Sequence, residues 1–142
     1  MKVQIHRKDP SVPLPSYQTN GSVAFDLAAA ENMTIPAHEI RLIPTGLVVC
    51  TPPGQMLLVA TRSSTPMKKG LMLANGIGIV DQDFCGPDDE IKIQVYNFTA
   101  KPVEIKKGDR IAQGLFLHLE RVEWEEVKEL ENKTRGGFGS TG

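Results

Sequence analysis

Apolar and polar side chains alternate along several short stretches of the chain. Residues 91–96 read Ile-Lys-Ile-Gln-Val-Tyr, and Leu115, Leu117 and Leu119 follow the same period of two. This period places one set of side chains on the buried face of a sheet, as in a half-buried β-strand. Residues 55–60 are more continuously apolar, which predicts a strand that is covered on both faces.

Turn-forming residues divide the chain into short segments. There are 10 prolines and 13 glycines, and turn signals such as Pro52 to Gly54 and Lys107 to Asp109 separate the apolar runs. Many short strands between such turns are typical of β-barrels and jelly rolls. We therefore predict an all-β fold, a jelly-roll-like β-barrel.

One short helix is expected after the apolar run. Ser63 or Ser64 can cap it, Pro66 is tolerated in its first turn, and Gly70 can end it.

The C-terminal part of the chain differs in composition from the rest. Residues 120–133 are charged around a few apolar side chains, and we predict a final strand there, with a short helix as the alternative. Glycines dominate residues 136–142, and such termini are usually flexible. We therefore divide the chain into a jelly-roll domain over residues 1–132 and a flexible Gly-rich C-terminal arm over residues 133–142.

Length and charge limit the classes of function. The 142 residues suit one domain, and a formal net charge of −1 lacks the broad positive field of a nucleic-acid binder. No run of about 18 apolar residues indicates a membrane span, and the N-terminus does not look like a signal peptide. Cys50 and Cys85 form no CxxC pair and give no zinc spacing with the histidines. A disulfide between them is possible, but nothing in the spacing supports it, so we expect a reducing cytoplasmic location.

Two polar clusters could bind phosphate and its counter-ion. Asp26 lies between apolar residues of a predicted strand, where it either faces solvent or contacts a hydrated magnesium ion. Arg62, Ser63 and Ser64 precede the helix. The serines could serve only as a cap, but a helix N-terminus beside an arginine is also a phosphate site.

A third cluster runs from Asn75 to Gly86. Two strands folding back around it would expose backbone groups that can read the edge of a flat base. Asp81 could accept a proton from an attacking water, and Phe84 could pack under a sugar. The alternative is a glycine-containing hairpin without a ligand.

Two further clusters lie near the C-terminus. Gln113 is polar within an apolar run and could contact a ligand, although the turn before it is ordinary. Phe138 stands among glycines, where an aromatic ring could stack on a base while neighbouring N–H groups and hydroxyls surround phosphates. A disordered linker is the alternative, and the lysine of a P-loop is missing.

Taken together and in this order, the five clusters resemble the five sequence motifs of the trimeric dUTPase family. The resemblance implies hydrolysis of dUTP to dUMP and pyrophosphate with Mg²⁺ on the triphosphate. It also implies a jelly-roll subunit in a homotrimer with active sites at subunit interfaces. Asp81 would be the general base, and Asp26 would contact the magnesium site through water. The implied substrate-binding residues are Asn75, Gly78 and Ile79 for uracil, Phe84 for deoxyribose, Arg62, Ser63, Ser64 and Gln113 for phosphates, Phe138 over the uracil, and Gly139, Ser140 and Thr141 over the triphosphate.

Two positions depart from the family pattern. Lys133 stands where many members have an arginine, and either Lys133 or Arg135 could cap the γ-phosphate. Ser64 gives Arg-Ser-Ser where many relatives have Arg-Ser-Gly, and dCTP deaminases, which share the fold, also carry Arg-Ser-Ser. Those enzymes need a glutamate where this chain has Gln94, which cannot titrate. Deamination is therefore the second reading, and a non-catalytic nucleotide- or partner-binding module is the third.

Overall fold

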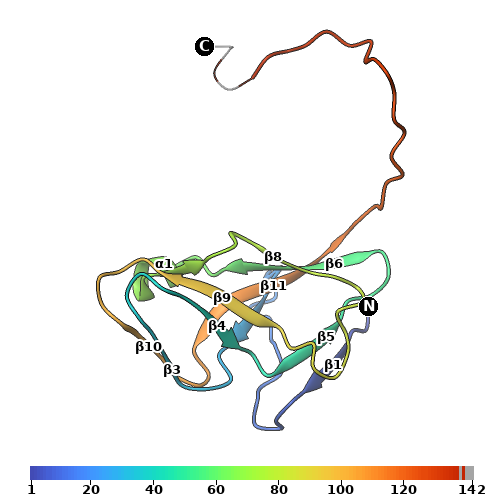
Figure 1. The fold of residues 1–142 in the computed structure, drawn as a ribbon. Helices are drawn as coiled ribbons and strands as arrows, with labels where there is room; N and C mark the ends of the chain where they lie inside the picture. The colour runs from blue at the N-terminus through green and yellow to red at the C-terminus, as the bar shows by residue number, and fades with distance from the viewer. Residues whose placement is uncertain (138, 140–142) are drawn as a thin grey trace.

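The computed structural model describes residues 1–137 and residue 139, and within these residues the fold consists of short β-strands and one short helix. The helix is α1 (Ser64–Lys69). Figure 1 shows the strands, which are β1 (Gln4–Arg7), β2 (Phe25–Ala28), β3 (Met33–Ile35), β4 (Ile40–Pro44), β5 (Leu47–Cys50), β6 (Gln55–Thr61), β7 (Leu71–Leu73), β8 (Gly78–Val80), β9 (Lys92–Asn97), β10 (Val103–Ile105) and β11 (Arg110–His118).

The strands form small antiparallel sheets around a common interior. The largest sheet has the order β2-β11-β6-β8, and a second has the order β4-β9-β7. Two further pairs, β1-β5 and β10-β3, complete the arrangement. Most neighbours in these sheets are far apart in sequence, as expected of a jelly roll. The predicted all-β, jelly-roll-like fold class is confirmed.

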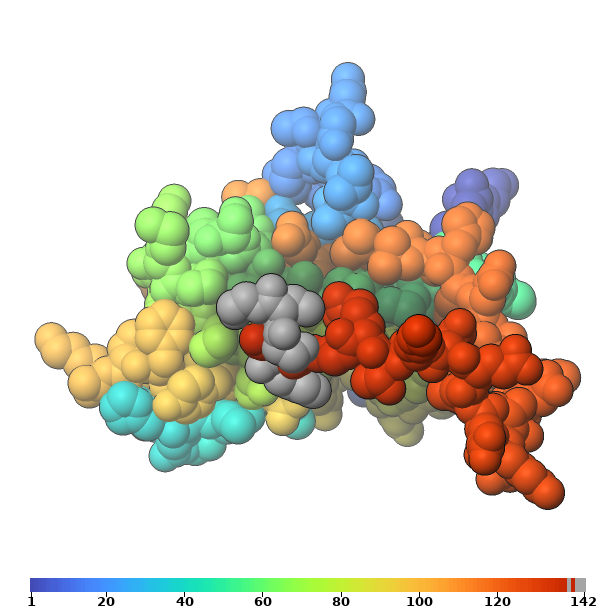
Figure 2. Space-filling view, turned by 90° about the horizontal axis from the view of Figure 1, so that it is seen from above, coloured from blue at the N-terminus to red at the C-terminus, as the bar shows by residue number. Residues whose placement is uncertain are grey.

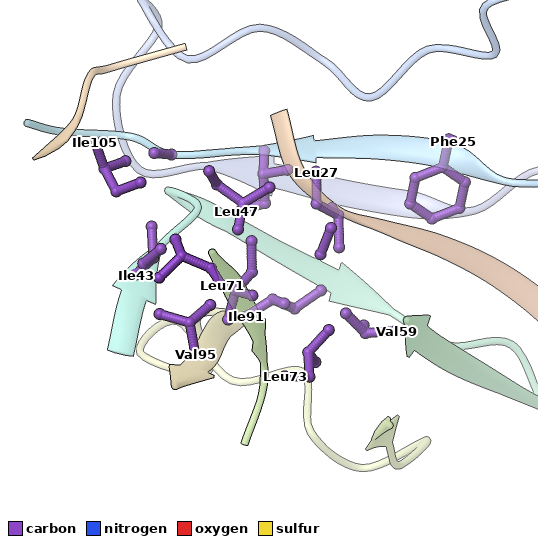
Figure 3. Close-up of a cluster of buried hydrophobic side chains, with 14 of the residues drawn as sticks. Phe25, Leu27, Ile43, Leu47, Val59, Leu71, Leu73, Ile91, Val95 and Ile105 are labelled. Atoms are coloured by element: carbon purple, nitrogen blue, oxygen red, sulfur yellow. The ribbon is translucent and has the colours of Figure 1, made fainter. Parts of the chain in front are cut away.

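Alternating side chains from both larger sheets build the core. In β9 every second residue is buried, as the period of two predicted. Strand β6 also alternates, with one face buried and the other only half-buried, so it is less covered than its continuous apolar pattern indicated. Leu27, Leu71 and Val95 meet in the interior shown in Figure 3, and each is at most 1% exposed.

Helix α1 follows β6 as the sequence predicted. Ser63 occupies the N-cap position, but its side chain makes no capping hydrogen bond. The Thr65 hydroxyl instead donates to the Ile111 carbonyl at 2.8 Å, which ties the helix to β11. Gly70 ends the helix with a φ of 67°, a left-handed conformation that favours glycine.

The segment after β11 contains no helix or strand as far as the structure describes it. The strand predicted for residues 120–133 is therefore wrong, and so is the alternative helix. The Leu119 N–H donates to the Gly54 carbonyl at 3.1 Å, after which residues 120–136 are exposed. Figure 1 shows this orange-to-red segment arcing away from the sheets, and in Figure 2 it lies in front of the body. The domain boundary at residue 132 stays a prediction.

Among the described residues, no helix has the length and apolar character needed to cross a membrane.

Candidate active site

A pocket of about 350 Å³ lies beside strand β8, between the two larger sheets. Five of the predicted site residues line it, namely Asn75, Gly78, Ile79, Asp81 and Phe84. The core residues Val59, Leu73 and Ile91 form its floor, and Gln94 of β9 also faces it. Apolar walls with a few polar groups are typical of a small-molecule site.

The strands on either side of residues 75–86 fold back on each other as predicted, but the segment between them is more than a simple hairpin turn. Strand β7 pairs with β9, whereas β8 pairs with β6, so the turn at residues 74–77 carries the chain from one sheet to the other. Gly76 has a φ of 73°, which allows this turn. Because β8 is the last strand of its sheet, the backbone groups along its outer edge are not used in sheet pairing. Such groups can pair with the edge of a planar base.

A second group of predicted residues forms a cluster of three charges. The Asp26 carboxylate accepts from Arg62 Nε at 2.6 Å and from Arg110 Nη1 at 2.9 Å. The Asp26 side chain is 12% exposed, whereas that of Arg110 is 47% exposed. Two guanidinium groups on one carboxylate leave a net positive charge that can receive a phosphate.

The remaining phosphate candidates lie around this cluster. Gln113 stands opposite Asp26 in the β2–β11 register, and its amide donates to the Thr61 carbonyl at 3.2 Å. Ser63 is exposed and Ser64 is half-buried at the start of α1. The strand positions of β2, β6 and β11 thus bring Asp26, Arg62 and Gln113 together from distant parts of the sequence.

The pocket and the charged cluster lie on opposite faces of the same sheet. Asp26, Gln113 and Ala60 are directly opposite one another across β2, β11 and β6, so their side chains share one face. Gly78 is opposite Val59, which is buried in the core. Successive strand residues point to opposite faces. Val59 and Gly78 therefore lie on one face of the sheet, and Asp26 and Gln113 lie on the other.

The donor set does not suit direct coordination of a metal ion. No group of three or more histidine, cysteine, aspartate or glutamate side chains could hold a metal within the residues that the structure describes. Both carboxylate oxygens of Asp26 already accept from arginines. Asp26 therefore fits a contact with the water of a magnesium ion held by phosphate, rather than a bond to the metal.

Two features of this region escaped the sequence analysis. Cys50 and Cys85, whose spacing gave no support for a disulfide, form one, and their Cα atoms are 5.0 Å apart. Arg110 follows a turn that looked ordinary, but it contacts Asp26. No local pattern signals either contact, because each joins residues that are far apart in sequence.

No described residue of the arm lines the pocket or pairs with the charged cluster. Lys133 and Arg135 are exposed, and so is Gly139, whose φ is 88°. Phe138, Ser140 and Thr141 lie outside the described residues.

The fold and site define an all-β protein with a base-sized pocket and a separate cationic cluster.

Its sequence matches the model of the dUTPase family over residues 10–142. The chain is 41% identical over 138 residues to the deoxyuridine 5'-triphosphate nucleotidohydrolase of Lactococcus lactis, an alignment covering 95% of this chain and 91% of that one. It is 39% identical over 144 residues to the enzyme of that name from Helicobacter pylori, covering 100% and 97%. The crystal structure of dUTPase from Streptococcus mutans superimposes with a TM-score of 0.79 at 32% identity, covering 87% of this chain and 100% of that one. The chain belongs to the dUTPase family.

Proposed function

We propose that the protein hydrolyses dUTP to dUMP and pyrophosphate, with Asp81 activating the water that attacks the α-phosphorus. Membership of the dUTPase family supports the reaction. The exposed Asp81 side chain at the rim of the β8 pocket is the observation that supports its role, since a general base must reach the water.

The pocket suits the uracil and deoxyribose of this substrate. Asn75 and the β8 backbone at Gly78 and Ile79 offer donors and acceptors along an edge strand. Gly78 packs closely on β6, since a Cβ on it would lie 3.2 Å from Val59 Cβ. Such a narrow wall opposes the C5 methyl of thymine, and Phe84 would lie against the sugar.

The charged cluster suits the triphosphate. Arg62, Ser63, Ser64 and Gln113 would bind phosphate oxygens, and bound magnesium would neutralise charge that develops on them. Asp26 would orient Arg62 and contact the hydration shell of the metal. The arm would complete the site, with Phe138 over the uracil, Gly139, Ser140 and Thr141 along the phosphates, and Lys133 or Arg135 at the γ-phosphate.

The arrangement of these parts supports active sites between subunits, as in the homotrimer that the family resemblance implies. One substrate cannot reach both faces of a sheet in one subunit, so pocket and cluster would come from different copies. The segment between β11 and the arm also carries exposed apolar side chains, with Trp124 at 92% and Leu130 at 82%, which a neighbouring subunit could cover. A cytoplasmic location stays a prediction, and the Cys50–Cys85 disulfide argues against the reducing compartment on which it was based.

Deamination of dCTP is the competing reaction, and Gln94 argues against it. Gln94 lines the same pocket as Asp81, but an amide cannot carry protons between water and the exocyclic amine. A non-catalytic binding module would not need a carboxylate at the pocket rim.

A product assay tests these three candidate functions. The purified protein is given magnesium and one of dUTP, dCTP or dTTP in separate reactions. We expect dUMP and pyrophosphate from dUTP, with little product from the other two. Asp81→Asn should abolish turnover while dUTP still binds, and Asp83→Asn, a change at an exposed carboxylate two positions away, is the matched control. Ammonia from dCTP would support the deaminase instead. Turnover that survives Asp81→Asn would refute the mechanism.

A further inference from the structure

The segment between β8 and β9 holds the turn that carries Phe84. It is anchored at its start, where the Gln82 side chain donates to the Gln55 carbonyl at 3.0 Å. At its end the Gly46 N–H donates to Glu90 Oε1 at 2.7 Å, and the Ile91 N–H donates to the Leu47 carbonyl at 2.9 Å. Both ends of the segment are therefore fixed to other strands or turns.

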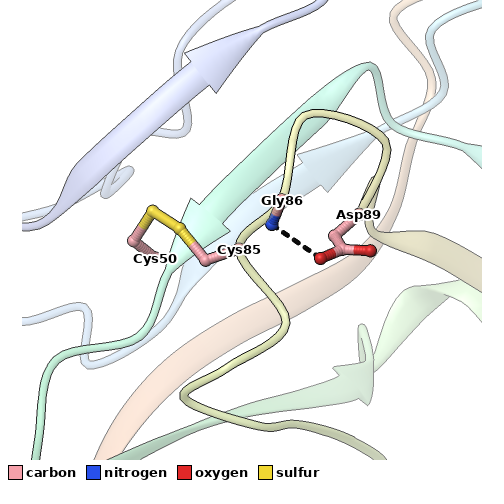
Figure 4. The surroundings of a disulfide bond; sticks show 4 residues. All are labelled: Cys50, Cys85, Gly86 and Asp89. Carbon is pink, nitrogen blue, oxygen red and sulfur yellow. Dashed lines mark hydrogen bonds between the residues drawn. A yellow bond between two sulfur atoms is a disulfide. The ribbon is translucent and has the colours of Figure 1, made fainter.

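The middle of the segment has only local hydrogen bonds. The Phe84 N–H donates to the Asp81 carbonyl at 3.4 Å, and the Cys85 N–H donates to the Asp83 carbonyl at 3.0 Å. The Gly86 N–H donates to Asp89 at 2.6 Å, as Figure 4 shows. Lys8 Nζ lies 3.9 Å from the Asp88 carboxylate, but the Asp88 side chain is 97% exposed, so solvent screens this pair. Within the described residues, the disulfide from Cys85 is the tie that joins the Phe84 turn to a distant strand.

The other end of the disulfide lies on a firm support. Cys50 is the last residue of β5 and stands opposite Gln4 of β1, and the preceding Val49 is 3% exposed in the core. The bond spans 35 residues of sequence and brings the Phe84 turn against this strand. Phe84 itself is 39% exposed and lines the pocket beside β8.

We infer that the Cys50–Cys85 disulfide is a positioning element for Phe84 and thereby sets the discrimination between deoxyribose and ribose substrates. The inference rests on the proposed function, in which Phe84 lies against the sugar. A ring that excludes a single hydroxyl group must be held within a fraction of an ångström, and local turn bonds alone do not provide such support. The covalent bond does, because it fixes the residue next to Phe84 to a buried strand.

The same bond makes the selectivity sensitive to reduction. A dithiol reductant attacks one sulfur as a thiolate and forms a mixed disulfide, and its second thiol then closes an oxidised ring. The products are two cysteine thiols and one oxidised dithiol, so atoms and electrons balance. Asp81 is affected less, because the neighbouring Val80 belongs to β8 and Gln82 is bonded to β6.

Steady-state kinetics with dUTP and UTP on oxidised and dithiol-reduced protein tests the inference, with thiol counting by mass spectrometry to establish each state. On reduction we expect KM for dUTP to rise and the preference for dUTP over UTP to fall by about tenfold, with kcat changed by less than about twofold. Cys50→Ser should reproduce the reduced enzyme, and adding reductant to it should change nothing further. This variant is the control for effects of the reductant elsewhere.

Two results would overturn the inference, namely two free thiols in protein never exposed to reductant, and equal selectivity in the oxidised and reduced forms. Hydrogen exchange over residues 82–86 separates this failure from a failure of the proposed function. Faster exchange on reduction, in protein that hydrolyses no dUTP, would support the positioning of the turn while refuting the assigned substrate. Unchanged exchange would refute the positioning whatever the activity.

Discussion

Nε of Arg62 lies 2.6 Å from the Asp26 carboxylate, and this ion pair joins strand β2 to the residue that follows β6. The second carboxylate oxygen binds Arg110, so one anion separates two cations that would otherwise repel each other. With its Nε engaged, Arg62 has the direction of its terminal N–H groups fixed. In the proposed function, the pair would therefore preorganise a phosphate site before substrate arrives.

Asp26→Asn should weaken the binding of phosphate at this site, although both arginines remain. A neutral amide cannot balance two guanidinium groups, and hydrogen bonds to charged groups contribute about 1.5–3 kcal/mol. We expect KM for dUTP to rise by about tenfold or more, measured at saturating magnesium. A magnesium titration at fixed dUTP should show a higher half-saturating magnesium concentration, since the proposed contact with metal-bound water would also be lost.

Asp88→Asn is the matched control, because the Asp88 side chain is 97% exposed and lies far along the chain from this cluster. If both substitutions leave KM unchanged, the cluster does not bind the triphosphate.

Deletion of residues 133–142 should reduce activity far more than stability. Residues 120–136 are exposed, so few contacts of the folded subunit are lost. The arm is proposed to cover base and phosphates and exclude water, so we expect kcat/KM to fall by about a hundredfold or more, with thermal unfolding almost unchanged. Phe138→Ala should cause part of this loss in kcat/KM, because only the proposed contact with the base would be removed. Kinetics identical to those of the full chain would restore the interpretation of the arm as an idle linker.

The period of two and the turn residues predicted much of the fold. Strand β9 alternates as its sequence does, because burying every second side chain is the main source of its stability. Helix α1 ends at Gly70 as expected, since the left-handed conformation is a local property of the chain.

Long-range pairing was not predictable in the same way. Strands folding back around residues 75–86 were predicted, and β7 does pair with β9, but no local pattern indicated that β8 within this segment pairs with β6. Residues 120–133 have a plausible strand pattern, but a strand needs a partner, and none of the described residues supplies one. The contacts of Cys50 with Cys85 and of Asp26 with Arg110 depend on the same pairing, so no local signal could find them.

Gly70→Ala should destabilise the protein through two effects. Its φ of 67° is unfavourable for alanine, and a Cβ would lie within van der Waals overlap of the Thr99 methyl group. We expect the free energy of unfolding to fall by about 2–4 kcal/mol, measured by urea denaturation. Gly54→Ala separates the two effects, since its φ is 72° but nothing lies within 4 Å of the added carbon. It should cost about 1 kcal/mol, and an equal loss in both variants would exclude the contact with Thr99.

The Lys69–Asp109 ion pair should make stability fall in acid. Burial raises the pKa of Asp109, but hydrogen bonds from the Lys69 side chain and the Lys106 N–H outweigh it and hold the pKa below its ordinary value. Because the folded-state pKa is the lower one, the stabilisation is complete above the unfolded value of about 3.9 and is lost as pH falls through the folded value. Both side chains are about one-third exposed, at 29% and 30%, so solvent screens the pair and we expect at most about 1 kcal/mol. The free energy of unfolding, measured with urea, should fall less between neutral pH and about pH 3 for Asp109→Asn than for the unmodified protein. The same difference in both would mean that other carboxylates cause the acid sensitivity.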